Sequence, residues 1–196
     1  TVIGYPGETV TIKGAGCNVA GAKYLIIKDM VIDVNSGANE GFYQGNGSYL
    51  RLHNVEVKNA LQQNILLAGS DAGGGFCEFI NVNSHDSGKI GNFDFEYHGI
   101  YVTTNGNLID GGLWHDNPYG TGIQLYPNPQ NNTVKNARVY SNMANYPDRQ
   151  GFVIYGSGNV VYNCLVYNHI TSNGLKFSTG GNFCYGSTFW NNNDSA

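Results

Sequence analysis

The stretch that decides the fold is residues 99–126, which read GIYVTTNGNLIDGGLWHDNPYGTGIQLY. A short run of alternating apolar residues starts at Gly99, a second run starts at Asn107, and a third follows Gly112. The sequence then returns to a copy of its own beginning at Gly122. A self-similar pattern that recurs every ~20 to 30 residues is typical of a solenoid.

The run that opens this stretch recurs along the chain. Its copies are GIYVT from Gly99, GIQLY from Gly122, GFVIY from Gly151 and GLKFS from Gly174, and NILLA from Asn64 and GFYQG from Gly41 fit the same position. In the four clearest copies the second and fourth residues are apolar, as expected for a strand with one buried face. The residues between them are therefore expected to point outward, in columns spaced about 4.8 Å apart.

A second set of segments aligns residue for residue. It comprises NLIDGGLWHDN from Asn107, NTVKNARVYSN from Asn132, NVVYNCLVYNH from Asn159 and NFCYGSTFWNN from Asn182. The alignment predicts one inward column of Leu50, Cys77, Ile109, Val134, Val161 and Cys184. It predicts a second inward column of Val57, Val82, Trp114, Val139, Val166 and Phe189. The runs are too short and too closely spaced for βαβ units, so we expect an all-β solenoid of parallel strands with about seven coils.

Composition sets the outer limits. The chain has 196 residues, 41% of them hydrophobic, which suits one domain spanning residues 1–196. The net charge of −4, without a basic stripe, argues against a nucleic-acid partner. No apolar run reaches the ~20 residues needed to cross a bilayer, so no membrane partner is expected. The chain opens and closes on strand-like runs, and we expect a fragment of a longer protein that lacks one or both caps.

The chain resembles the pectate-lyase-like family of right-handed parallel β-helix proteins. The resemblance rests on YPGETVTIKG, HGIYVTTNGNLIDGGLWHDN and TGIQLY and extends over nearly the whole chain. It implies a right-handed, single-stranded parallel β-helix, which is also our fold prediction. It does not fix the activity, because this coil pattern serves lyases, hydrolases, epimerases and phage tailspikes. Of the polygalacturonase motifs only His98-Gly99 is present, and the arginine-rich motif of calcium pectate lyases is missing.

The outward face of the Gly99-type strands offers the most chemistry. A lyase acting on a uronate must neutralise a carboxylate, remove the adjacent proton and protonate the leaving oxygen. The residue types for these steps on this face and its loops are His98, Tyr101, Arg149 and Lys176, which we take as candidate catalytic residues. Tyrosines pack against sugar rings and polar side chains bind hydroxyl groups. The candidate substrate-binding residues are Glu40, Tyr43, Gln124, Tyr126 and Tyr155.

Calcium is kept as a candidate cofactor because several carboxylates fall in loops on one side of the predicted helix. The candidate ligands are Asp86, Asp94, Glu96 and Asp148, although their spacing follows no known calcium motif. The four cysteines are expected to be buried free thiols rather than disulfides or zinc ligands.

Other repeated polar and aromatic residues have simpler explanations. Asn59, Asn117, Asn142 and Asn192 are expected to satisfy corner backbone groups. Arg51, Glu78, Asp110 and Lys135 are assigned to one outward position as alternating charges. His115, Tyr140, Tyr167 and Trp190 share an outward column and are expected to stack on one another.

These observations favour a secreted or extracellular polysaccharide lyase that acts on an acidic, uronate-containing polysaccharide. One alternative is a non-catalytic β-helix that binds glycans or forms a structural spike, with self-association through open solenoid ends. A second is a glycoside hydrolase, which needs two carboxylates about 5 to 10 Å apart. Asp94, Glu96 and Asp148 are the candidates for that pair.

Overall fold

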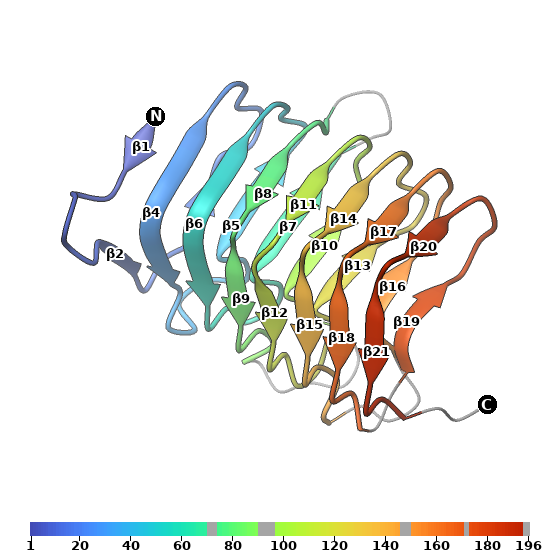
Figure 1. Ribbon diagram of the computed structural model, residues 1–196. Coiled ribbons are helices and arrows are strands. Elements are labelled where there is room, and N and C mark those ends of the chain that lie inside the picture. Colours follow the sequence, from blue (N-terminus) through green and yellow to red (C-terminus); the bar gives the residue numbers. More distant parts are fainter. Residues whose placement is uncertain (70–73, 90–96, 146–149, 171–172, 194–196) are drawn as a thin grey trace.

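A computed structural model describes residues 1–69, 74–89, 97–145, 150–170 and 173–193. It is a parallel β-solenoid of about seven turns, as predicted, and its termini lie at opposite ends of the stack (Figure 1). The described residues contain no helix, and hence none that is long and apolar enough to cross a membrane.

Two parallel sheets form the walls of the solenoid. Sheet B, which lies behind sheet A in Figure 1, contains seven strands, namely β3 (Cys17–Asn18), β5 (Phe42–Gly45), β7 (Ile65–Ala68), β10 (Ile100–Val102), β13 (Ile123–Leu125), β16 (Gln150–Ile154) and β19 (Asn173–Phe177). All of these except β3 are the strands predicted from the Gly99-type copies.

Sheet A is bent and contains fourteen strands. Its first four are β1 (Val2–Ile3), β2 (Thr11–Lys13), β4 (Ile26–Asp33) and β6 (Arg51–Lys58). From there each coil supplies two strands with a bend between them, namely β8 (Glu78–Ile80) and β9 (Asn83–His85), β11 (Leu108–Asp110) and β12 (Leu113–His115), β14 (Thr133–Lys135) and β15 (Arg138–Tyr140), β17 (Val160–Tyr162) and β18 (Leu165–Tyr167), and β20 (Phe183–Tyr185) and β21 (Thr188–Trp190).

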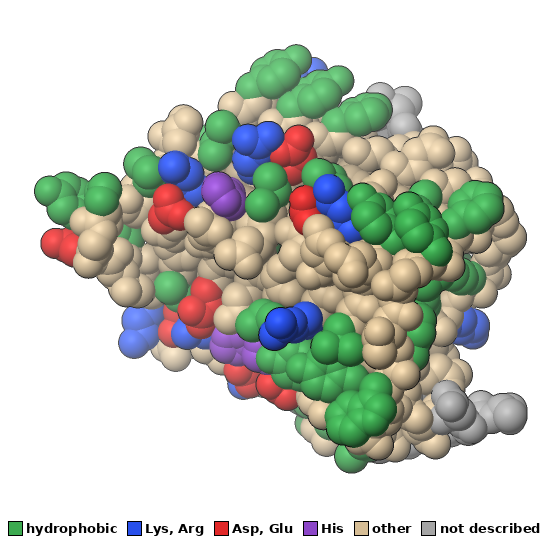
Figure 2. Space-filling model, in the orientation of Figure 1, with side chains coloured by type: hydrophobic (Ala, Val, Ile, Leu, Met, Phe, Trp, Pro, Cys, Tyr) green, Lys and Arg blue, Asp and Glu red, His purple; other side chains and the backbone are tan. Residues whose placement is uncertain are grey.

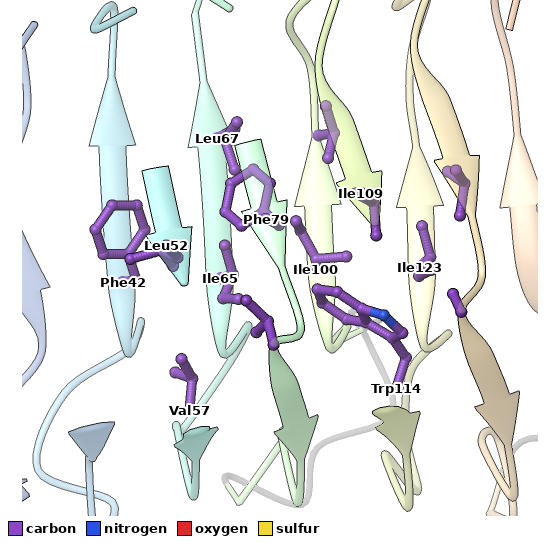
Figure 3. Packing of buried hydrophobic residues seen from close by; sticks show 14 of the residues in the cluster. Phe42, Leu52, Val57, Ile65, Leu67, Phe79, Ile100, Ile109, Trp114 and Ile123 are labelled. Atoms are coloured by element: carbon purple, nitrogen blue, oxygen red, sulfur yellow. The ribbon is translucent and has the colours of Figure 1, made fainter. Parts of the chain in front are cut away.

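The core fills the space between the sheets. Figure 3 shows Phe42, Ile65, Ile100 and Ile123 of sheet B pointing toward side chains of sheet A, among them the fully buried Trp114. Burying one isoleucine or phenylalanine side chain stabilises a fold by roughly 1.5–3 kcal/mol. Because every coil contributes apolar residues from both sheets, the core runs continuously along the solenoid axis.

The inward columns of sheet A differ from the predicted ones in two coils. The prediction places Leu50, Cys77 and Val82 in these columns, whereas the ladder pairing has Leu52, Phe79 and Ser84 there. Side chains alternate with a period of two, so a slip of two residues leaves every side chain on the same face. The apolar pattern therefore could not detect this slip.

The cysteines are free thiols, as predicted, but not all are buried. Cys77 and Cys164 are buried, Cys17 is half-buried and Cys184 is exposed. Cys184 pairs with Val161 in an inward column, but it lies on β20, an outermost strand of sheet A, so one side of it is uncovered. Burial raises the pKa of Cys164 to about 11, which makes this thiol unreactive near neutral pH.

The corner before sheet B is lined by a ladder of side chains, Asn117, Asn142, His169 and Asn192, which we call the Asn/His ladder. Asn117 Nδ2 donates to Asn142 Oδ1 at 2.8 Å, and Asn192 Oδ1 lies 2.9 Å from His169 Nδ1. The prediction of structural asparagines is confirmed for Asn117, Asn142 and Asn192. Asn59 lies elsewhere, donating to Asp33.

The glycine at the start of each of the last four sheet B strands leaves room for this ladder. A Cβ on Gly122 would lie 2.7 Å from Asn142 Nδ2, and one on Gly151 would lie 2.0 Å from the His169 ring. Real Cβ atoms do not approach so closely, so any larger residue would displace the ladder. The Gly99-type signature is thus a consequence of the corner packing.

Candidate functional site

The outward side of sheet B carries a row of tyrosines from successive coils. Ladder pairing aligns Tyr43, Leu66, Tyr101, Gln124, Val153 and Lys176 in one outward column. Tyr126 and Tyr155 follow at the ends of β13 and β16. We call the surface formed by Tyr43, Tyr101, Gln124, Tyr126, Val153, Tyr155 and Lys176 the tyrosine face.

Three of these tyrosines are in contact across three coils. The ring centroids of Tyr101 and Tyr126 are 6.3 Å apart in a stacked arrangement, and those of Tyr126 and Tyr155 are 4.8 Å apart, edge to face. Tyr126 is 39% exposed, while Tyr101 and Tyr155 are half-buried. The result is a continuous aromatic surface that follows the solenoid axis, and it brings together three of the predicted residues.

Gln124 occupies the middle of this surface. It points away from the core, yet only 8% of it is exposed, and the neighbouring Val153 is 4% exposed. The Oε1 atom of Gln124 has no hydrogen-bond partner among the described residues. An unsatisfied buried acceptor costs about 1–3 kcal/mol, so a rotation of this side chain toward a ligand hydroxyl would be favourable.

His98 lies under the edge of the tyrosine face. Only 3% of the residue is exposed, and its ring centroid is 5.5 Å from that of Tyr101. The Thr121 backbone N–H donates to His98 Nδ1 at 3.0 Å, and the Thr121 hydroxyl lies at the same distance from it. Burial lowers the pKa of His98 to about 3, so the imidazole is neutral and only weakly basic.

The remaining predicted catalytic residues are separated along the face. Lys176 is exposed on β19, three coils beyond Tyr101 on β10. Arg149 lies outside the described residues. The geometry therefore brings His98 and Tyr101 together but does not bring Lys176 to them, and the catalytic assignments stay predictions.

A hollow of about 280 Å³ lies at the other end of the face. It is lined by Gly16, Cys17, Asn18, Ala38, Glu40 and Tyr43. Two predicted binding residues, Glu40 and Tyr43, thus lie side by side in one concave site. Burial raises the pKa of the Glu40 carboxyl.

The candidate calcium ligands do not form a site within the described residues. Asp86 accepts from Lys89 Nζ at 3.2 Å, and one of its oxygens lies 2.7 Å from His85 Nδ1. Asp94, Glu96 and Asp148 lie outside the described residues. No group of three metal-binding side chains occurs in the part of the chain that the structure describes.

The outer face of sheet A carries charged pairs between two edges that are rich in aromatic residues. Figure 2 shows the charged side chains in blue and red and the hydrophobic side chains of the edges in green. Arg51 pairs with Glu78, and Lys135 Nζ lies 3.1 Å from Asp110, but a two-residue offset separates these pairs, so the predicted single outward position is wrong. On the lower edge the His115 ring stacks on Tyr140 and the Tyr140 ring on Tyr167, at 4.6 and 4.8 Å. The predicted stacking is thus confirmed for His115, Tyr140 and Tyr167.

Sequence reasoning missed the aromatic residues on the upper edge. Tyr24, Tyr49 and Phe76 stack on one another at the corner between sheet B and sheet A. These three aromatic residues directly precede Leu25, Leu50 and Cys77. Aligning them with Gly106 would have revealed that they share one position. The two-residue slip described above concealed that alignment.

Comparison with known proteins identifies the family. Residues 40–196 match the family described as a right-handed beta helix region, and the chain belongs to this family. Membership of the pectate-lyase-like superfamily is consistent with this match. Neither the curated proteins nor the solved structures gave a match.

Proposed function

We propose that the tyrosine face binds a polysaccharide chain that runs along the solenoid axis. The observation that carries this proposal is the contact between Tyr101, Tyr126 and Tyr155 across three consecutive coils. Aromatic side chains offer flat apolar surfaces that pack against sugar rings, and a few polar groups between them provide orientation. Gln124, with its unpartnered oxygen, is such a group.

Lys176 favours a uronate-containing chain. Its exposed ammonium attracts carboxylates at one end of the face. At the other end burial raises the pKa of the Glu40 carboxyl. An acidic polysaccharide is an extracellular ligand, so the proposal carries with it a secreted protein.

The proposal is one of binding and does not assign a proton acceptor. A general base works best when its pKa lies near the working pH, and the buried His98, with a pKa of about 3, is far from that value. His98 also uses Nδ1 as an acceptor from Thr121, which suits a role in holding the loop against sheet B. Because His98 is buried and only weakly basic, a lyase activity would need a different residue as its base.

Affinity gel electrophoresis with polygalacturonate and alginate tests the binding. We expect retention of the protein in at least one gel and a loss of about tenfold in affinity for Tyr126→Thr. Threonine is the residue at Thr103, the position that pairs with Tyr126 in the preceding coil, so the variant keeps a side chain that the fold already accepts there. Lys176→Gln should weaken the same binding and reduce its salt dependence.

Tyr140→Phe serves as the matched control, because Tyr140 belongs to the stack on sheet A. It should bind as the unmodified chain does. Absence of retention in every gel, or equal retention of Tyr126→Thr, would rule out the tyrosine face as a binding site. The protein can also be incubated in solution with the same polysaccharides. Absorbance of an unsaturated product would then show lyase activity.

A further inference from the structure

One position of the corner between sheet B and sheet A is left-handed in all seven coils. Its backbone φ lies between 53° and 77° at Tyr24, Tyr49, Phe76, Gly106, Asn131, Gly158 and Gly181. The residues just before the first four of them, Lys23, Ser48, Gly75 and Asn105, are joined by parallel bridge pairs, which places these four in register. In the last four coils the position is taken by glycine or asparagine, which enter this conformation at little cost.

The first three coils place bulky aromatic residues in the same conformation. A left-handed residue with a large side chain costs roughly 1–2 kcal/mol, and burial does not offset that cost here. Tyr24 is 75% exposed, Tyr49 is 48% exposed and Phe76 is 56% exposed. The solenoid can form this corner without aromatic rings, as Gly106 and Asn131 show.

The three rings form one stack, which we call the aromatic ladder. The Tyr24 and Tyr49 centroids are 5.1 Å apart with planes at 3°, and the Tyr49 and Phe76 centroids are 5.5 Å apart with planes at 14°. The ladder ends at Gly106, because a Cβ there would lie 2.7 Å from Phe76 Cε1. Stacking returns about 0.5–1.5 kcal/mol per pair, which at best balances the backbone cost.

The aromatic ladder forms one wall of a hollow on the outer side of sheet A. The hollow has a volume of about 260 Å³ and is lined by Tyr24, Ile26, Tyr49, Leu50, Arg51, Phe76 and Glu78. Arg51 and Glu78 form an ion pair on β6 and β8, with side chains 43% and 35% exposed. The site therefore combines an apolar wall with hydrogen-bond donors and acceptors whose net charge is zero.

We propose that this hollow is a second carbohydrate site, which takes a neutral oligosaccharide. Sugar rings present apolar C–H faces and hydroxyl groups together, and the hollow offers a partner to each of them. The aromatic ladder contacts the C–H groups, while Arg51 donates to hydroxyl oxygens and Glu78 accepts from hydroxyl groups. An anionic chain is disfavoured because Glu78 already neutralises Arg51, the one cationic side chain that lines the hollow.

Affinity electrophoresis against laminarin, xyloglucan, galactomannan and dextran tests the proposal. We expect retention by at least one of them, reduced about tenfold by Tyr49→Asn and unchanged by Tyr126→Thr on the tyrosine face. Asparagine is the residue at Asn131, so Tyr49→Asn keeps a side chain that suits the left-handed backbone. A second variant, Arg51→Gln, keeps the aromatic ladder and should weaken the same retention.

Three results would overturn the proposal. They are absence of retention by all four polysaccharides, retention that Tyr49→Asn leaves unchanged, and retention that Tyr126→Thr removes to the same extent. The unmodified chain, Tyr49→Asn and Arg51→Gln should show the same thermal midpoint within a few degrees. Lost retention then reports on the hollow rather than on unfolding.

Discussion

The two halves of the solenoid build the same corner in different ways. In the first three coils, the left-handed position carries Tyr24, Tyr49 and Phe76, and the residue after it is apolar. In the last four coils, that position carries glycine or asparagine, and the residue after it belongs to a hydrogen-bonded ladder of Asn107, Asn132, Asn159 and Asn182, in which the first three are buried and the last is half-buried. We call these four residues the Asn ladder.

The difference separates stability from function. Each amide of the Asn ladder bonds the next, and Asn132 Oδ1 also accepts from the Asn107 backbone N–H at 2.8 Å. These buried bonds hold the corner together, because an unpaired group there would lose both water and a partner. The aromatic ladder is exposed and strained, so its contribution to folding is small, and the proposed ligand gives it a role that folding does not.

The largest expected effect comes from replacing the Asn ladder with the apolar solution of the other half. Asn132→Leu introduces leucine, the residue that Leu50 provides at this position in the other half. The backbone N–H and the side-chain amide of Asn107 and the carbonyl of Gln130 then lose the partner that Asn132 gives them now. We expect the free energy of unfolding to fall by about 4 kcal/mol, measured by denaturant titration. A loss below about 1 kcal/mol would show that the Asn ladder is not what holds this corner.

The second effect concerns the histidine of the Asn/His ladder. Burial lowers the pKa of His169 to about 4, whereas the unfolded chain has the ordinary value of about 6.5. Between these values the unfolded state takes up the proton, so this contribution to stability is complete above about pH 6.5 and is lost as the pH falls. Through His169, the unmodified chain should lose about 3 kcal/mol of stability between about pH 7 and pH 4. We expect His169→Asn to abolish this part of the loss.

Urea titrations at several pH values check this prediction, with asparagine chosen because it already fills the Asn117, Asn142 and Asn192 positions of the ladder. His98, whose pKa burial lowers further, keeps part of the acid sensitivity in the variant. An unchanged pH profile would mean that His169 is solvated or already protonated in the folded chain.

A third variant probes the apolar core of the first coils. Gln44 is fully buried and pairs with Leu67 in an inward column of sheet B, and neither polar atom of its amide has a partner among the described residues. Replacing an unsatisfied buried amide with an apolar group of similar size is stabilising. We expect Gln44→Leu to raise the free energy of unfolding by about 1 kcal/mol, while destabilisation would reveal a partner such as a bound water.

The repeat was enough to predict the fold and most of the inward residues. Alternation within GIYVT and its three clearest copies gave the correct face for β10, β13, β16 and β19, and the glycine signature marked the start of these strands. The register in the coils that contain Leu50 and Cys77 was wrong by two residues, because a two-residue slip leaves the alternation unchanged.

The candidate sites were harder to predict. The tyrosine face followed from outward columns, and the structure shows the rings of Tyr101, Tyr126 and Tyr155 in contact. The burial of His98 did not follow, because it depends on how the loop before Gly99 packs against Thr121 in the next coil. The aromatic ladder was also missed, because the two-residue slip hid the alignment of Tyr49 and Phe76 with Gly106.

The smallest expected effect is also the most direct test of the central claim, that the same corner serves stability in one half of the solenoid and ligand binding in the other. The measurement is the free energy of unfolding of Tyr49→Asn, which exchanges an exposed, strained tyrosine for the residue found at Asn131. We predict a change of less than about 1 kcal/mol, because lost stacking and relieved backbone strain offset each other. A loss of more than about 2 kcal/mol would show that the aromatic ladder holds the fold together, and would contradict the division between the two halves.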